Sequence, residues 1–172
     1  MVSNEEISVN KRNGRGKESL QIDKIHAMVG FATDGITGVS ASHVEMNSGI
    51  QLFDGISTAD IQQILIKSAN DLITLENPNY QYVAARLLLF SLRKQLFHRL
   101  WDHPKLIDHI KKLIDMGLYD KDILVNYDES EIDRMNMWID HERDYNFTYA
   151  GLRQVMDKYL VQDRSTGEIF ET

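Results

Sequence analysis

The chain has 172 residues, a formal net charge of −7 and no cysteine. Its apolar content of 42% and charged content of 26% are typical of a globular protein with one or two domains. The sequence lacks both a membrane-spanning apolar run and the apolar core of a signal peptide, so we expect a cytoplasmic protein with no membrane partner. Without cysteine, this chain cannot form disulfides or use a thiolate.

Charge is distributed unevenly along the sequence. Residues 1–95 contain nine Lys/Arg and ten Asp/Glu, and residues 96–172 contain ten and sixteen, so the two parts carry −1 and −6. There is no extended basic stripe, and we therefore expect no nucleic-acid partner. The basic residues concentrate between Lys11 and Lys17, where four cations surround the pair Asn13-Gly14.

This basic segment predicts a β-hairpin. Residues alternate in polarity from Ile7 to Lys11 and again from Leu20 to Ile22, and an Asn-Gly pair between extended runs is a strong hairpin signal. The cations suit a compact anion such as a nucleotide phosphate. An ordinary solvated hairpin with surface lysines fits the same pattern, and the spacing alone does not separate the two interpretations.

Two helices are predicted after the hairpin. Asp23 is a candidate cap for the first, which we expect to stop at Gly35. Ser42 and Glu45 have the spacing of a capping box and predict a second, short helix.

Two further helices complete the first part. Ser57 and Asp60 form a similar start signal for the third helix, with apolar residues at helical spacing up to Leu72. Asn77-Pro78 breaks the chain, and a fourth helix is expected to run to about Gln95.

The second part predicts shorter helices and a final hairpin. The expected helices cover residues 106–113, 120–126, 129–138 and 150–158, and the expected strands cover 159–162 and 168–171. The last strand leaves an apolar, incomplete edge, and such edges favour pairing with another chain.

Neither GxxxxGK[ST] nor GxGxxG occurs, so a phosphate site here must use side chains. The candidates are Lys11, Arg12 and Lys24 beside the hairpin, and Arg93 and Lys94 on the fourth helix.

Metal and redox chemistry find no support in the sequence. The six histidines form neither an HxxxH nor an HExxH pair, so we expect no metal site and no redox cofactor. Asp140 to Asp144 has the composition of a charged surface turn, and Trp101 and Trp138 are interpreted as core or interface anchors.

Several stretches, taken in order, resemble the N-terminal part of the large, catalytic subunit of class I ribonucleotide reductase, of the bacterial and phage type. The resemblance is continuous from about Val9 to Thr172. Its most specific stretches are Val9–Gly14, Asp23–His26, Phe53–Ile61, Tyr80–Leu87 and Lys158–Gln162.

The resemblance implies a mainly α fold with a small β component (α+β). In that family the first ninety-odd residues form the ATP cone, a β-hairpin lid over a four-helix bundle that binds ATP or dATP as an allosteric effector, together with Mg²⁺. Residues 1–95 would form this domain. Residues 96–172 would form the helical segment that leads into the catalytic barrel, ending in an incomplete β-hairpin.

The same resemblance implies roles for residues of the lid. Val9, Lys11 and Arg12 match residues near the base and phosphates. Glu18 and Gln21 match residues that contact the adenine.

Other matching positions lie on the helices. Lys24, Thr58 and Lys94 match phosphate contacts, and a helix N-terminus at Thr58 also favours an anion. Ile61 is expected to pack on the nucleotide, and Phe90 matches a site residue of the fourth helix.

The chain also departs from the enterobacterial pattern. The lid is about one residue longer around Gly16, and Gln62 and Ser91 replace histidines that are associated with the dATP response. The alternative is therefore a cone that binds nucleotide without dATP inhibition.

The missing cysteines set the functional hypotheses. Family chemistry needs a thiyl-forming cysteine and a reducing cysteine pair, so this chain cannot reduce a nucleotide alone. We expect it to act with the remaining C-terminal part of the large subunit and the small radical-generating subunit. The alternatives are a free-standing ATP/dATP sensor and a structural remnant that binds nothing.

Overall fold

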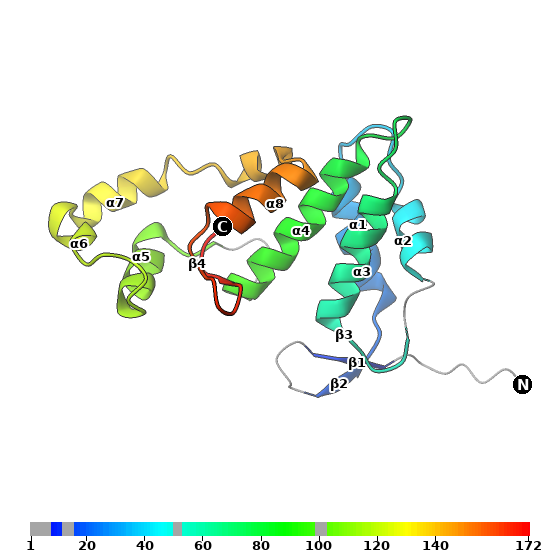
Figure 1. Ribbon diagram of the computed structural model, residues 1–172, viewed down its shortest axis with the longest axis horizontal. Coiled ribbons are helices and arrows are strands. Elements are labelled where there is room, and N and C mark those ends of the chain that lie inside the picture. The colour runs from blue at the N-terminus through cyan, green and yellow to red at the C-terminus, as the bar shows by residue number, and fades with distance from the viewer. Residues whose placement is uncertain (1–7, 12–15, 50–52, 99–102) are drawn as a thin grey trace, which may run out of the picture. The chain divides into compact units, whose positions relative to one another are not determined.

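The computed structural model describes residues 8–11, 16–49, 53–98 and 103–172, and it is mainly helical with small β-sheets (Figure 1), as the sequence predicted. The chain divides into two compact units. The first comprises Met1–Ser91 and Phe147–Leu152, and the second comprises Leu92–Asn146 and Arg153–Thr172. No helix among the described residues has the length and apolarity needed to cross a membrane.

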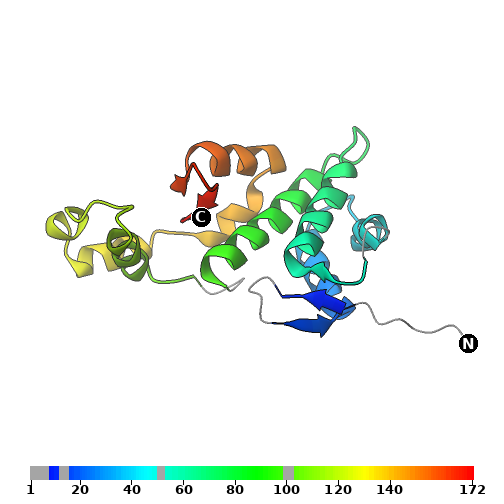
Figure 2. The ribbon, with the colours of Figure 1, turned by 60° about the horizontal axis from the view of Figure 1, so that its bottom comes forward.

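The first unit contains a small sheet, visible at the N-terminal end of the chain in Figure 2. Its strands are β1 (Ser8–Asn10), β2 (Lys17–Ser19) and β3 (Ile56–Ser57). β1 is central in this described sheet, with β2 antiparallel on one side and β3 parallel on the other. The predicted hairpin is thus confirmed, whereas β3 was not predicted.

The second strand of the hairpin lies earlier than the sequence indicated. Leu20 follows β2 and Ile22 is already the first residue of a helix, so the expected strand at these two positions is wrong. The Asn13-Gly14 turn lies outside the described residues.

Four helices are described for residues 22–97. They are α1 (Ile22–Thr33), α2 (Ala41–Gly49), α3 (Thr58–Asp71) and α4 (Tyr80–Phe97). Buried apolar side chains hold this unit together, because folding removes them from water: they lie along one face of α1 and of α3, whereas α4 is buried on nearly all sides from Val83 to Phe90. The core residues that share very low exposure include Val29, Val44, Leu65, Ile66, Val83 and Leu87.

Two predicted helix starts need correction. Gln21, not Asp23, is the N-cap of α1, and it makes no side-chain cap hydrogen bond; Asp23 lies in the first turn. Ser42 lies inside α2, so it cannot cap that helix, and Glu45 instead contacts His26 at 2.7 Å. In both cases the helix starts one residue ahead of the residue that the local capping pattern indicated.

The start of α3 agrees with its sequence signal. Ser57 is the N-cap and its hydroxyl accepts a hydrogen bond from the backbone N–H of Asp60 at 3.0 Å. Between α3 and α4, Asn77 and Pro78 lie outside any helix. The buried Gln62 joins these helices, because its Nε2 donates to the Leu87 carbonyl at 2.9 Å.

The second unit has shorter elements and a smaller core. It contains α5 (Leu106–Asp115), α6 (Ile123–Asn126), α7 (Glu129–Asn136), the 3₁₀ helix η1 (His141–Asn146), most of α8 (Tyr149–Lys158), β4 (Gln162–Asp163) and β5 (Glu168–Ile169). Ile107, Ile110 and Ile132 form a buried cluster between α5 and α7. α7 begins with an Asp128–Glu131 capping box that the sequence analysis missed.

Two further predictions for the second unit can be compared with the structure. The C-terminal hairpin is confirmed, with Gln162 opposite Ile169 and Asp163 opposite Glu168, although its strands are shorter than expected. Trp138 was interpreted as a core or interface anchor; at 78% exposure it is not a core residue, and the interface role stays a prediction. Trp101 lies outside the described residues.

Candidate functional site

The end of β1 and the start of α3 lie at one edge of the first unit's sheet. Asn10 pairs with Ser57 in the parallel β1–β3 ladder. The residues that follow, Lys11 and Thr58, therefore leave the sheet in the same direction, because neighbouring parallel strands run side by side. The fold thus brings together two residues that are 47 positions apart and that were both predicted for the site.

Lys11 is held across the hairpin. Its Nζ lies 3.0 Å from Oε2 of Glu18, and its backbone N–H donates to the Gly16 carbonyl at 3.1 Å. The Lys11 side chain is 44% exposed, so this ion pair lies in water and contributes little stability. An anionic ligand can therefore compete for the Lys11 ammonium at small cost.

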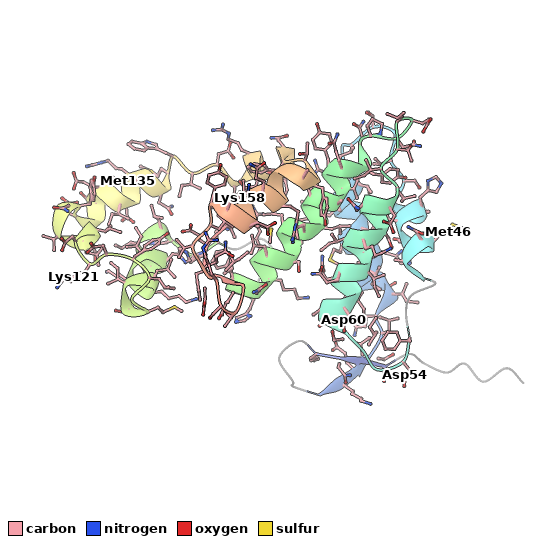
Figure 3. The ribbon with its side chains drawn as sticks, viewed as in Figure 1. Met46, Asp54, Asp60, Lys121, Met135 and Lys158 are labelled. Carbon is pink, nitrogen blue, oxygen red and sulfur yellow. The ribbon has the colours of Figure 1, made fainter. Side chains whose placement is uncertain are left out.

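The turn before β3 is bonded to β1. Asp54 Oδ1 accepts from the Ser8 backbone N–H at 2.8 Å and from the Ser8 hydroxyl at 2.7 Å, which lowers the pKa of Asp54. Gly55 donates its N–H to the Ser8 carbonyl at 2.8 Å and has a φ of +80°, which favours glycine. Figure 3 shows Asp54 in this turn, beside the strands.

Asn10 completes the connection between the hairpin and this turn. Its Nδ2 donates to the Gly55 carbonyl at 2.6 Å. Sequence reasoning missed these contacts, although the Asp54-Gly55 pair was a turn signal that could have suggested them. Together they position the hairpin at the N-terminal end of α3.

Two helices begin next to the sheet, as Figures 1 and 2 show. α1 starts three residues after β2 ends, and α3 starts directly after β3. Helix N-termini carry unpaired N–H groups and a partial positive charge, which favour phosphate. Lys24 adds an exposed ammonium in the first turn of α1, and Thr58 is the half-buried first residue of α3.

The apolar site candidates are buried in the first unit. Val9 is 2%, Ile61 6% and Phe90 1% exposed. The Phe90 ring packs on Phe31 of α1, with centroids 5.3 Å apart and planes tilted by 52°. Phe31 was not predicted for the site, and its 36% exposure makes it the more accessible ring of this pair.

The remaining predicted residues differ in exposure and in the unit to which they belong. Gln21 is exposed beside the start of α1, and Lys94 is exposed near the end of α4, within the second unit. Arg12 lies outside the described residues. Arg93 was a phosphate candidate, but it is 1% exposed and bound to Asp144 at 2.8 Å, so that interpretation is wrong.

Metal ligands do not cluster in the described part of the chain. Among those residues, no group of three or more His, Asp or Glu side chains is placed to hold a metal ion. The chemistry that the described site offers is therefore ammonium groups and helix N-termini next to buried apolar side chains. That combination suits a ligand with an anionic part and a flat apolar part.

A family model of the ATP cone domain matches residues 7–95, which include both helix N-termini and the whole sheet. The chain belongs to the ATP cone family. A nucleotide effector is the ligand class that this family implies. Residues 7–95 are called the cone below.

Curated relatives match almost the whole chain. It is 46% identical over 169 residues to ribonucleoside-diphosphate reductase 1 subunit alpha of Escherichia coli (strain K12), covering 98% of this chain and 22% of the relative. The corresponding values are 47% over 169 residues for the alpha subunit of Haemophilus influenzae (98% and 22%) and 42% over 166 residues for that of Enterobacteria phage T4 (96% and 22%).

The chain spans about a fifth of the length of these relatives and corresponds to their N-terminal region. The likeness extends beyond the cone, because the aligned 169 residues include most of residues 96–172. The second unit is therefore related to the reductase alpha subunits as well.

Proposed function

We propose that the cone binds ATP or dATP as an allosteric effector. The observation that carries this proposal is the β1–β3 register, which sends Lys11 and Thr58 out of the same sheet edge. The triphosphate binds at this edge, where Lys11, Lys24 and the N-terminus of α3 supply positive charge. Arg12 and Lys94 are further phosphate ligands in this proposal.

The base occupies the apolar side of the site. Phe31, which is 36% exposed, supplies accessible aromatic surface, and the buried Val9, Ile61 and Phe90 are the apolar core behind it in this proposal. Glu18 and Gln21 have acceptor and donor atoms that can recognise an adenine amino group and ring nitrogen. Apolar surface with a few polar groups is the usual composition of a nucleotide pocket.

Mg²⁺ enters this site on the phosphates. Phosphate-bound Mg²⁺ keeps several waters and needs one or two protein carboxylates at most.

Calorimetric titration with ATP tests the proposal. We expect one ATP per wild-type chain, and no measurable binding after Lys24→Ala, because the triphosphate then loses an ammonium ligand. Lys67→Ala is the matched control, since Lys67 is an exposed lysine of α3 paired with Asp71 at 2.6 Å and lies outside the proposed site. Equal affinities for wild type and Lys24→Ala would contradict the proposal.

A second candidate function is a cone that binds ATP and dATP without dATP inhibition. Gln62 is 3% exposed and its amide is bonded to the Leu87 carbonyl, so this side chain is committed to the α3–α4 contact. A neutral amide at this position cannot acquire the charge of a histidine. Similar calorimetric affinities for both nucleotides, with no dATP-dependent loss of activity in the assembled enzyme, would support this candidate.

We further propose that the chain contributes to reduction of ribonucleoside diphosphates only with the cysteine-bearing catalytic portion of a large subunit and with the small radical-generating subunit. The support is the 46% identity to an alpha subunit, together with the absence of cysteine from the sequence. The second unit is the docking part in this proposal, because Met137, Trp138 and Ile139 are 74%, 78% and 45% exposed.

Co-purification tests this second proposal. The tagged chain is expected to retain a cysteine-bearing alpha-subunit chain and to restore ATP-dependent reductase activity to it. Replacing Trp138 by Ala should weaken the association, whereas replacing the exposed Leu75 of the first unit should not. A chain that stays monomeric and leaves the catalytic chain unaffected would contradict the proposal and favour a free-standing ATP/dATP sensor.

A further inference from the structure

Arg93 is a buried charged residue for which the proposed nucleotide site has no use. Its Nη2 lies 2.8 Å from Oδ2 of Asp144 and donates to the His141 carbonyl at 3.3 Å, and its Nη1 donates to the Tyr145 hydroxyl at 2.9 Å. All three partners belong to η1. A buried guanidinium needs such partners, and its planar fork fixes their directions.

A second line of contacts joins the same two elements. Phe97 of α4 packs edge-on against His103, with ring centroids 5.8 Å apart. The His103 ring in turn stacks on His141, with centroids 3.6 Å apart and planes inclined by 6°. The last two turns of α4 thus hold η1 through an ion pair and through stacked rings, and all these residues lie in the second unit.

Helical spacing relates this contact to the proposed nucleotide ligands. Phe90, Arg93 and Phe97 follow one another at intervals of three and four residues, so they lie along one face of α4. Lys94 is the next residue after Arg93. Arg93, which contacts η1, therefore lies in the same turn of α4 as Lys94, a proposed phosphate ligand, and both residues belong to the second unit.

The hydrogen bonds of the Arg93 guanidinium to described residues leave one of its donors unpaired. The Arg93 Nε is buried and has no hydrogen-bond partner in the described structure, and the Asp144 side chain remains 30% exposed. Arg93 therefore has one donor without a partner among the described residues, and its ion-pair partner Asp144 is accessible to solvent.

We propose that Arg93 is a positioning residue that couples nucleotide binding to η1. This inference rests on the proposed nucleotide-binding function. A nucleotide phosphate held by Lys94 fixes the last turns of α4, and Arg93 transmits this constraint to Asp144 and Tyr145, which belong to the same unit. Coupling is reciprocal, so weakening the Arg93–Asp144 pair weakens nucleotide affinity by the factor with which nucleotide stabilises η1.

The test combines calorimetry with amide hydrogen exchange of residues 141–146, measured with and without ATP. In the wild type, ATP is expected to slow exchange in η1. In Asp144→Asn this slowing disappears, and the ATP dissociation constant rises about five-fold, the lower end of typical coupling. Arg93→Lys keeps one ion pair and is expected to lie between the two.

The chain offers a matched control. Arg153 and Asp157 form an exposed ion pair in α8, with Nη2 and Oδ1 3.5 Å apart, so Asp157→Asn removes the same charge without touching η1. Neither ATP affinity nor η1 exchange is expected to change in this variant. If Asp144→Asn does not fold, Tyr145→Phe removes a single acceptor of Arg93 and is read in the same way.

The outcomes separate this inference from the proposed function. A wild-type chain that does not bind ATP overturns both. A wild-type chain that binds ATP, with η1 exchange insensitive to ATP and an unchanged affinity in Asp144→Asn, overturns the coupling role alone.

Discussion

The two units differ in what stabilises them. In the first unit, α1, α3 and α4 contribute many buried apolar side chains, including Val29, Leu65 and Leu87. In the second unit the buried apolar set among the described residues is small, and it is supplemented by polar contacts such as the Arg93–Asp144 pair and the Asp128 capping box. The second unit also exposes Met137 and Trp138.

The two units therefore differ in how much buried apolar surface stabilises them. Burial of apolar area is the main stabilising term in folding, so the cone has the stabilisation expected of an autonomous domain. The second unit has less of it. Both units leave large apolar side chains in water, such as Leu75 in the first, but in the second unit Met137, Trp138 and Ile139 are consecutive, which is typical of a surface that another protein covers. If the two units differ in this way, substitutions in their cores should have unequal effects on stability.

The largest expected effect is in the core of the first unit. Leu65 is 1% exposed, and Leu65→Ala is expected to lower the free energy of unfolding by about 2–5 kcal/mol, because it removes buried methyl groups and leaves a cavity. Urea denaturation followed by circular dichroism measures this. Leu75→Ala is the control, since Leu75 is 97% exposed, and equal losses in the two variants would contradict the assigned core.

A smaller loss is expected from the core of the second unit. Ile132 is 1% exposed, and Ile132→Ala should cost about 2 kcal/mol, the low end for such changes, because the small cluster around it can relax. Urea denaturation is measured as before, and amide hydrogen exchange in α5 and α7 reports the loss of stability in the second unit itself. A larger loss than in Leu65→Ala would reverse the comparison between the units.

The cap of α3 ranks next. The Ser57 hydroxyl accepts from the Asp60 N–H at 3.0 Å, and Ser57→Ala should cost about 1 kcal/mol. The alanine variant also loosens the start of α3 beside Thr58, so its ATP affinity should fall. Ser57→Asn should keep the wild-type ATP affinity, because asparagine is also a good N-cap. An alanine variant with wild-type stability and affinity would exclude a role for this cap.

The smallest effect concerns pH. Hydrogen bonds from Ser8 lower the pKa of Asp54, so this contact stabilises the hairpin above the pKa of the unfolded chain and is lost as pH falls through the lower, folded pKa. In an NMR pH titration, the chemical shift of the Ser8 amide should change as Asp54 takes up its proton. The Asp54→Asn variant should show no such pH-dependent change at Ser8. Asp128 in the second unit has its pKa lowered by hydrogen bonds from Ser130 and Glu131 and serves as a reference.

The sequence predicted the helices of the first unit well, because their apolar periodicity and the Ser57 cap are local signals. It failed where a distant contact decided the outcome. Asp23 was expected to cap α1, but the helix starts one residue ahead of it, at Ile22, with Gln21 as the N-cap. Strand β3 has only two residues and exists because it pairs with β1, which no local pattern reveals.

The candidate site shows the same division. Cationic residues such as Lys11 and Lys24 were found from composition, and Thr58 came only from the family resemblance. The Asn10–Gly55 and Ser8–Asp54 hydrogen bonds join residues about 45 positions apart and became visible only in the structure. Arg93 was misread as a phosphate ligand because its partner Asp144 is 51 residues away.

The central claim, that the cone is the nucleotide-binding part of this chain, is tested most directly by NMR chemical-shift mapping with ATP. Our account predicts shifts concentrated at the amides of Lys11, Lys24 and Thr58, with small secondary shifts in η1 and none in α6 or α7. Shifts confined to residues 103–140, or no shifts at saturating ATP, would contradict it.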